Sequence, residues 1–327
     1  MKYITSVWGI GSDDLPAVRH FFSVGLQDTF FENGYNPTYS GCAPVRTIKS
    51  FIFKEFIMKK MVSAALMAAV FVTAFAGCKK KPVETADNSF EELKGRGVFV
   101  IGLDDSLPPM GFRNDDGAIV GFDIDLAKEV ANRLGVEFKA QPIDWDAKEL
   151  ELSTGKIDCI WNGLTMTAER EAALTFTKPY LNNDQVLVVR KDGGINSLSD
   201  MEGKIVGVQS GSSAQKAIAS NSAFADSVKE TIFFKDNLTA LNDLLVGGVD
   251  GVVMDSIVAA YDIAKSKKPL VIIEESLSKE KYGVAFRKGD VKLAAEVQKL
   301  LEEMAADGTA AAISMRWFGN DISVIGK

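Results

Sequence analysis

The residues best suited to bind a charged ligand lie between Gly163 and Arg170, directly after a predicted strand. The backbone amides of Gly163, Leu164 and Thr165, the Thr165 hydroxyl and the Arg170 guanidinium are all hydrogen-bond donors. Arginine binds a carboxylate through two parallel charge-assisted hydrogen bonds, and ligands of open α/β folds bind where strands leave the sheet. The segment therefore suits a carboxylate. Taken alone, it is more typical of a helix start capped by Thr167, with a solvated arginine.

Three further segments could complete a site for a zwitterion. Asp255 follows the apolar residues 252–254, and a carboxylate there can hold an ammonium group. Residues 209–213 (QSGSS) lead into a helix that begins near Ala214. Their amides and hydroxyls suit either an anion or plain helix capping. Residues 144–146 (DWD) offer an aromatic surface to a ligand, or a side chain for the core.

The elements that position these residues alternate between strand and helix. Residues 98–103 (VFVIGL) form a short apolar run typical of a buried parallel strand, and residues 157–161 indicate another. Residues 122–134 place apolar side chains at helical spacing, and Gly135 ends that helix. This alternation predicts an α/β fold.

A faint internal repeat indicates two similar lobes. Residues 152–160 (LSTGKIDCI) parallel residues 244–252 (LLVGGVDGV), and residues 97–103 parallel residues 203–209. The two copies lie roughly a hundred residues apart, whereas a solenoid repeats every 20–50 residues.

Composition excludes several functional classes. The 327 residues are 46% hydrophobic and 25% charged, which is typical of a globular protein. The net charge of −7 argues against a nucleic-acid binder with a broad basic surface. The single histidine, His20, and the three cysteines Cys42, Cys78 and Cys159 make a histidine-based triad, a zinc site or a disulfide framework improbable. No metal or cofactor is expected.

Residues 58–78 have the pattern of an export signal. A short basic start at 58–61 precedes the uncharged stretch 62–75, which is too short to span a bilayer. Residues 75–78 (FAGC) resemble a bacterial lipoprotein box with Cys78 as the lipidated residue, although Phe75 replaces the usual leucine. A buried helix is the alternative. We expect a lipid-anchored protein in the periplasm or at the cell surface.

A signal does not normally follow 57 other residues, and residues 1–57 show no sustained periodicity. We therefore expect translation to start at Met58, so that residues 1–57 are not native. A real N-terminal extension is the alternative. Residues 79–88 are predicted to be a linker.

Ten ordered motifs between residues 90 and 320 resemble polar amino-acid-binding proteins of bacterial ABC importers, the extracellular solute-binding proteins of family 3. In chain order they are Asp104 with Pro108-Pro109, 121–127 (GFDIDLA), 144–146 (DWD), 155–158 (GKID), 163–170 (GLTMTAER), 176–180 (FTKPY), 207–212 (GVQSGS), 250–255 (DGVVMD), 307–309 (DGT) and 316–319 (RWFG).

This resemblance implies the two-lobe clamshell of type II periplasmic-binding proteins, each lobe a mostly parallel sheet flanked by helices. Lobe 1 would comprise residues 89–185 plus 282–327, and lobe 2 residues 186–281. Two crossover hinge strands would lie near 186–190 and 282–287.

The resemblance also implies roles for individual residues. Arg170 would bind the ligand α-carboxylate with Thr165 and Ser213, while Asp255 would bind the α-ammonium beside the Gly163 carbonyl. The residues that would contact the ligand side chain are Asp104, Leu107, Trp145, Asn162 and Gln209. Leu107 replaces an aromatic residue that relatives often have, which leaves Trp145 as a single aromatic wall.

The implied function is an extracytoplasmic receptor that delivers an amino acid to an ABC permease, as a monomer and without nucleic acid. The acceptor Asp104 favours a neutral polar or a basic ligand side chain, with a slight preference for basic. A dehydratase on the same fold, a sensor ectodomain and an adhesin are the alternatives. An enzyme would need a catalytic acid in the cleft, and we expect none.

Overall fold

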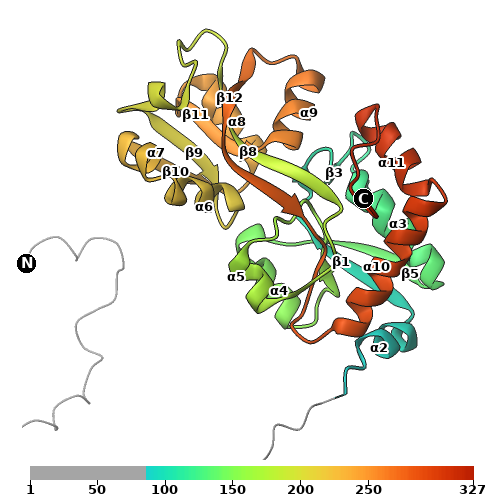
Figure 1. Ribbon diagram of the computed structural model, residues 1–327. Helices are drawn as coiled ribbons and strands as arrows, with labels where there is room; N and C mark the ends of the chain where they lie inside the picture. The colour runs from blue at the N-terminus through green and yellow to red at the C-terminus, as the bar shows by residue number, and fades with distance from the viewer. Residues whose placement is uncertain (1–85) are drawn as a thin grey trace, which may run out of the picture. The chain divides into compact units, whose positions relative to one another are not determined.

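The computed structural model describes residues 86–327, which form two α/β lobes joined by two long strands (Figure 1). The predicted non-native segment 1–57, the signal 58–78 with Cys78, and most of the linker 79–88 lie outside the described residues. Within residues 86–327, no helix combines the length and the apolar character that a membrane span requires.

The first lobe contains a five-stranded sheet in the order β5-β1-β6-β13-β7. Strand β1 pairs in parallel with both β5 and β6, and β13 runs antiparallel to its two neighbours. The strands are β1 Val98–Leu103, β5 Glu137–Pro142, β6 Cys159–Ile160, β7 Thr175–Phe176 and β13 Ala285–Phe286, beside a small sheet of β2 Ser106–Leu107, β3 Gly111–Arg113 and β4 Ile119–Val120. The helices are α2 Ser89–Arg96, α3 Phe122–Leu134, the short 3₁₀ helix η1 Trp145–Ala147, α4 Lys148–Ser153, α5 Ala168–Ala173, α10 Val291–Ala306 and α11 Thr309–Phe318.

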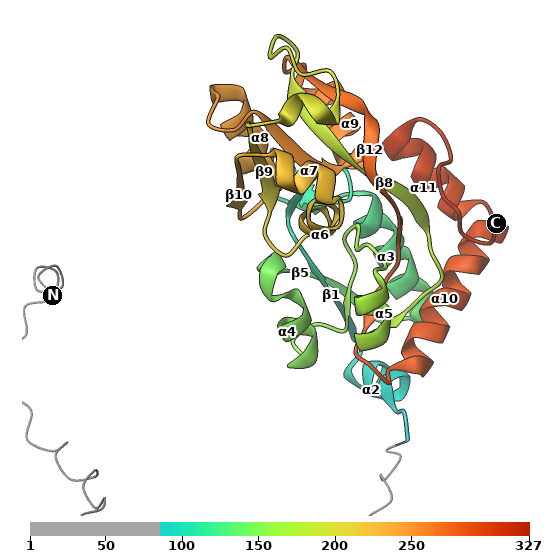
Figure 2. The same ribbon diagram turned by 60° about the vertical axis from the view of Figure 1, so that its left-hand side comes forward.

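The second lobe contains a five-stranded sheet in the order β10-β9-β11-β8-β12. Strands β9, β10 and β11 are parallel, and β8 runs against both of its neighbours. The strands are β8 Leu181–Arg190, β9 Ile205–Gln209, β10 Glu230–Phe234, β11 Gly251–Asp255 and β12 Leu270–Tyr282. The helices are η2 Leu198–Met201, α6 Ser213–Ser220, α7 Ser222–Ser227, α8 Asn237–Val246 and α9 Ser256–Ser266 (Figure 2).

The predicted internal repeat is confirmed by the hydrogen bonds of two equivalent aspartates. Asp158 Oδ2 accepts from the Val100 amide over 2.8 Å, and the Asp158 amide donates to the Val100 carbonyl over 2.7 Å. Asp250 makes the same pair with Ile205, over 3.0 and 2.8 Å. Asp158 thus links the start of β6 to β1 in the first lobe, and Asp250 links the start of β11 to β9 in the second.

The core explains why the local predictions for β1 and α3 are confirmed. Phe99, Ile101 and Leu103 of β1 are buried in one cluster with α3 and α10, whereas Val100 packs on the opposite face against a second cluster. A strand that is buried on both faces has a continuous run of apolar residues in its sequence. Helix α3 ends where Gly135 adopts φ +68° and donates its amide to the Ala131 carbonyl, a turn that glycine adopts without steric cost.

The two lobes are linked by an antiparallel ladder in which residues 181–185 of β8 pair with residues 278–282 of β12. The hinge strands were predicted later in the chain, near 186–190 and 282–287. Residues 186–189 instead pair with β11 inside the second sheet, and residues 285–286 form β13 of the first sheet. The apolar residues 186–189 are buried inside the second lobe, where they pair with β11. The preceding polar residues 182–185 therefore form the part of β8 that passes between the lobes. The exact division into lobes stays a prediction.

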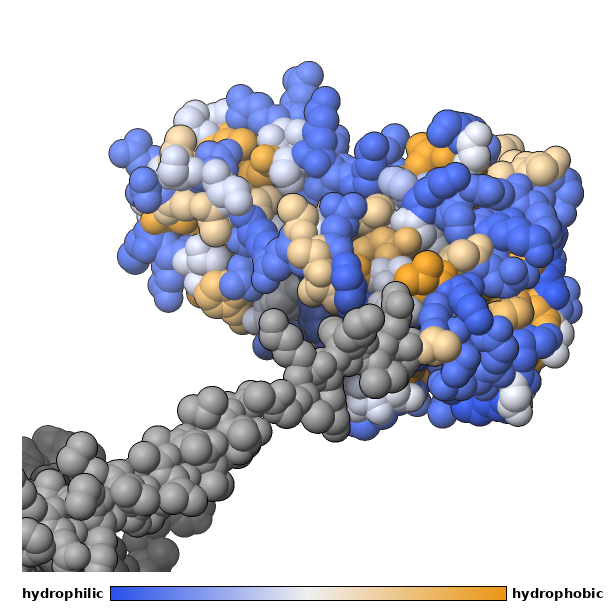
Figure 3. Space-filling view, turned by 60° about the horizontal axis from the view of Figure 1, so that its bottom comes forward, coloured by the Kyte–Doolittle hydropathy of each residue, from blue (hydrophilic) through white to orange (hydrophobic). Residues whose placement is uncertain are grey.

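The face shown in Figure 3 is mostly hydrophilic, with hydrophobic residues scattered singly or in small groups. A surface of this kind is normal for a folded domain in water.

Candidate ligand-binding site

The predicted site residues gather where the two lobes meet, at the carboxyl ends of strands β6, β9 and β11. Eight of the eleven line one small, partly closed cavity of about 10 Å³ together with Ser212: Leu107, Trp145, Gly163, Thr165, Arg170, Gln209, Ser213 and Asp255. The other three, Asp104, Asn162 and Leu164, lie behind this lining. All eleven are largely buried in the described structure.

Arg170 is positioned by the first turn of α5 and is not solvated. Thr167 caps the helix, since its Oγ1 accepts from the Arg170 amide over 3.2 Å, as the helix-start interpretation predicts. The guanidinium is nevertheless buried, with a relative exposure of 6% for the residue. Its Nη1 donates to the Thr165 carbonyl over 3.0 Å and its Nη2 to the Gly211 carbonyl over 3.2 Å. Two of the five N–H groups of an arginine are thus directed at backbone oxygens.

Burial lowers the pKa of Arg170, although the nearby carboxylates of Glu149, Glu280 and Asp255 favour its charged form. The closest carboxylate oxygen, on Glu149, lies 3.7 Å from Nε and belongs to a half-exposed side chain. A buried guanidinium with its remaining N–H groups beside a cavity is suited to bind an anion.

Asp255 ends strand β11 and presents the opposite charge to the same cavity. Its Oδ1 accepts from Asn183 Nδ2 over 2.7 Å and from Gln185 Nε2 over 2.8 Å. Burial raises the pKa of Asp255 to about 6, and the negative charge of Glu280 acts in the same direction. The carboxylate is therefore mostly ionised at neutral pH and can pair with a cation.

Thr165 and Ser213 bring hydroxyl groups from the two lobes together. Their Oγ atoms lie 2.9 Å apart. Ser213 is the first residue of α6, and Ser212 caps this helix by accepting from the Gln215 amide over 3.4 Å. The capping interpretation of residues 209–213 is thus confirmed for Ser212, a lining residue that the prediction omitted, while Ser213 faces the cavity.

A polar network extends from the lining residue Gln209. Gln209 Nε2 donates to Asp104 Oδ2 over 2.8 Å, and the Asp104 amide donates to Asn162 Oδ1 over 3.1 Å. Burial raises the pKa of Asp104. Trp145 lines the cavity and also packs in a core cluster with Leu164, whose side chain is fully buried there, while its contact with a ligand stays a prediction.

Sequence reasoning missed a buried lysine. Lys148 of α4 is only 2% exposed, and its Nζ donates to the Gly211 carbonyl over 2.8 Å and to the Trp145 carbonyl over 3.0 Å. Burial lowers the pKa of Lys148 to about 8, and Arg170 acts in the same direction. The available signal was the spacing of Lys148 and Leu152, which places the lysine on the apolar face of its helix.

Two polar residues of the linking strands were also missed. Gln185 is fully buried, and its Nε2 lies within 2.8–3.1 Å of Asp255, Glu280 and Ser213. Glu280 accepts from Thr165 Oγ1 over 2.8 Å. Among the described residues, no group of three or more His, Cys, Asp or Glu side chains could hold a metal ion.

Two α/β lobes that enclose a cavity of opposite buried charges define a small-molecule-binding protein. Residues 99–320 match the model of a family described as bacterial extracellular solute-binding proteins, family 3, and the chain belongs to this family. The resemblance inferred from the ordered motifs is confirmed.

Three similar proteins illustrate the family. The L-cystine-binding protein TcyJ of Escherichia coli (strain K12) is 32% identical over 261 residues, which cover 79% of this chain and 96% of TcyJ. The structure of an ABC uptake transporter substrate-binding protein from Streptococcus pneumoniae with bound histidine is 36% identical, covers 73% of this chain and 99% of that protein, and has a TM-score of 0.71. Tv2483 bound to L-arginine is 32% identical, with a TM-score of 0.71 and coverage of 74% and 98%. The predicted clamshell fold is thereby confirmed.

Proposed function

We propose that this protein is an extracytoplasmic receptor that binds a polar amino acid, neutral or basic, and delivers it to an ABC import permease. The observation that carries the proposal is the placement of Arg170 and Asp255 in the lining of one small cavity between the lobes. Their charges are those that the α-carboxylate and the α-ammonium of an amino acid require. Because Arg170 belongs to the first lobe and Asp255 to the second, a ligand that pairs with both stabilises the closed arrangement.

The polar residues around Gln209 support the choice of ligand side chain. Asp104 lies directly behind the lining residue Gln209 and accepts a hydrogen bond from it, so an acidic ligand beside Gln209 would approach the like charge of Asp104. Lys148 does not reverse this preference, because its ammonium donates to the backbone carbonyls of Gly211 and Trp145, beside Arg170. The names of the similar proteins, which refer to cystine, histidine and arginine, support the same class of ligand.

A thermal-shift panel of amino acids, followed by calorimetry of the best ligand, tests the proposal. We expect stabilisation by basic or neutral polar amino acids, and a loss of affinity of about 30-fold or more for Asp255→Asn, because the ligand ammonium loses its buried partner. The matched control Asp226→Asn, at an exposed position of the same lobe, should bind like the wild type. Preferential stabilisation by glutamate or aspartate would contradict the pocket assignment.

We further propose that the protein is a receptor and not an enzyme, as supported by the binding-protein relatives. Incubation with candidate amino acids should return each of them unchanged, and turnover would favour the dehydratase alternative.

Export through residues 58–78 and lipidation of Cys78 complete the proposal. Intact-mass analysis of protein extracted from membranes should show an acylated chain that begins at Cys78. A species that retains residues 1–57 would contradict this processing.

A further inference from the structure

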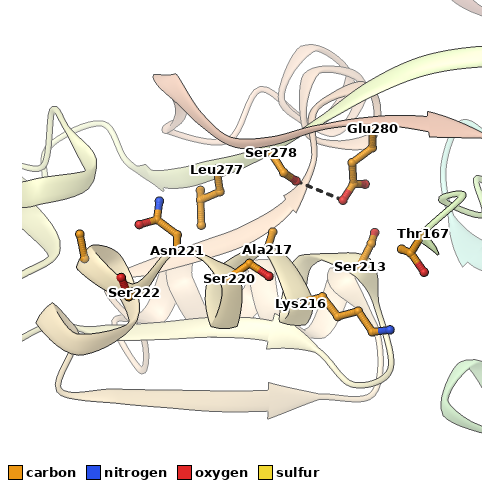
Figure 4. A pocket seen from close by; sticks show the side chains of 11 residues that line it. Thr167, Ser213, Lys216, Ala217, Ser220, Asn221, Ser222, Leu277, Ser278 and Glu280 are labelled. Atoms are coloured by element: carbon orange, nitrogen blue, oxygen red, sulfur yellow. Dashed lines mark hydrogen bonds between the residues drawn. The ribbon is translucent and has the colours of Figure 1, made fainter. Parts of the chain in front are cut away.

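The carboxylate of Glu280 accepts a hydrogen bond from the Thr165 hydroxyl, which the proposed site would otherwise offer to a ligand carboxylate. Glu280 lies on β12, in the ladder that links the lobes, and its Oε2 accepts from Thr165 Oγ1 over 2.8 Å. The same oxygen accepts from Gln185 Nε2 over 2.9 Å. The second oxygen, Oε1, accepts from Ser278 Oγ over 3.1 Å (Figure 4).

These contacts determine the direction of a chain of hydrogen bonds. A hydroxyl has one proton, and an ionised carboxylate only accepts, so Thr165 donates its proton to Glu280. Ser213 must then donate its proton to Thr165 across their 2.9 Å contact. Neither of the two hydroxyls proposed to bind the ligand carboxylate retains a proton for it.

Glu280 also shares a donor with the residue proposed to bind the ligand ammonium. Gln185 Nε2 bonds both Glu280 Oε2 and Asp255 Oδ1, over 2.9 and 2.8 Å. The two carboxylates therefore lie close together, and Glu280 contributes to the raised pKa of Asp255. If Glu280 served only to bind the ligand ammonium beside Asp255, it would not need the hydrogen bond from Thr165.

The Glu280 side chain also borders a second cavity, into which it could turn. It lines a cavity of about 560 Å³ along α6, whose other lining residues are mostly polar. Figure 4 shows Thr167, Ser213 and Lys216 on the side of this cavity where Glu280 stands. Lys216 is half-exposed and pairs with Glu169, so the region already holds a cation. A carboxylate turned into this cavity would be solvated and would release Thr165.

We propose that Glu280 tunes the ligand affinity: it competes with the ligand α-carboxylate for the hydroxyls of Thr165 and Ser213, and it turns into the cavity along α6 when the ligand binds. The inference rests on the proposed function. An internal competitor lowers the affinity for every α-carboxylate ligand by the free energy of its own hydrogen bonds, which favours release to a permease.

The test compares Glu280→Ala and Glu280→Gln with the wild type by calorimetry, using L-arginine, L-histidine and L-cystine as probes. Removal of an ordinary contact residue weakens binding, whereas removal of a competitor tightens it. We expect affinity for the α-carboxylate probes to rise about tenfold in Glu280→Ala, since hydrogen bonds to charged groups have this magnitude. Glu274→Ala is the matched control, because it removes the same charge from an exposed position of β12 and should leave affinity unchanged.

A second comparison separates competition from a general effect of charge. The gain should be much smaller for L-argininamide and L-histidinamide, which keep the ammonium and lack the carboxylate. If Glu280→Ala folds poorly, Glu280→Gln, which keeps the size of the side chain, should still bind the α-carboxylate probes more tightly than the wild type does. Unchanged or weaker binding of the acids by folded variants would overturn the inference alone. Failure of the wild type and every variant to bind any probe would overturn the proposed function as well.

Discussion

Lys148 and Gly211 belong to different lobes and meet in a hydrogen bond of 2.8 Å from the lysine Nζ to the glycine carbonyl oxygen. The Arg170 guanidinium donates to the same oxygen over 3.2 Å. Gly211 has φ +68°, and a Cβ built on it would lie 2.7 Å from Asp146 Oδ1 and 3.1 Å from Asp146 Cα. The approach of the two lobes therefore depends on a backbone carbonyl and on the absence of a side chain at Gly211.

Gly211→Ala should oppose closure of the lobes, because the new methyl group would press against the backbone of Asp146. We expect the dissociation constant for the ligand to rise at least about tenfold, because affinity is reduced by the fraction of molecules that can close. Calorimetry and the radius of gyration with saturating ligand measure both effects. Gly203→Ala is the matched control, since Gly203 has the same φ of +68° but no atom within 4 Å of a built Cβ. Equal behaviour of the two variants would assign the effect to backbone strain alone.

Lys148→Met should weaken ligand binding about tenfold or more through the loss of one charged hydrogen bond between the lobes. The free energy of unfolding should change little, because methionine also removes the cost of burying an ammonium. The control is Lys156→Met, at an exposed lysine that pairs with Glu151. Wild-type affinity in Lys148→Met, measured by calorimetry, would show that closure does not depend on this contact.

Ligand affinity should fall with decreasing pH through the ionisation of Asp255. Its pKa is about 6, and only the ionised form attracts the ligand ammonium. About a tenth of the molecules are ionised at pH 5, so the affinity should be about tenfold lower there than at pH 7.5. Asp255→Asn should bind weakly at both pH values. Calorimetry at constant ionic strength measures this dependence, and a wild-type profile that stays flat would exclude Asp255 as the ammonium partner.

Asp123 should make the folded protein less stable as the pH rises. Burial raises its pKa to about 7 from an ordinary value of 3.8, although its Oδ2 accepts from the Gly163 amide over 2.7 Å and from Tyr180 Oη over 3.0 Å. Because the folded state holds this proton more tightly, its contribution to stability is complete below pH 4 and is lost as the pH rises through 7. The loss is up to about 4 kcal/mol.

Asp123→Asn keeps the size of the side chain and does not titrate. The difference in unfolding free energy between the wild type and Asp123→Asn, measured in urea from pH 4 to 8, should therefore shift in favour of the variant as the pH rises. Parallel curves for the two proteins would contradict a raised pKa at Asp123.

The amino-acid sequence by itself determined the elements whose signals are local. The apolar run of β1 and the helical spacing of α3 with its final Gly135 predicted both elements at the bounds that the structure has. The repeat shared by residues 152–160 and 244–252, in which a glycine, an apolar residue and an aspartate recur, predicted two similar lobes. The resemblance carried by the ordered motifs implied that Arg170 and Asp255 share one site, and both line one cavity because the segment 163–170 follows β6 and Asp255 ends β11 at the carboxyl edges of their sheets.

Only the tertiary structure decided which polar residues are buried between the lobes. The spacing from Leu152 is the one local feature that separates Lys148 from a solvated lysine, and it does not name the partner, because the burial of Lys148 depends on Gly211, 63 residues further along the chain. Likewise, Gln185 and Glu280 meet across 95 residues through the register of two strands. Hydrogen bonds of this kind form after distant segments have packed, so their partners are determined by the three-dimensional approach of the lobes rather than by neighbouring residues.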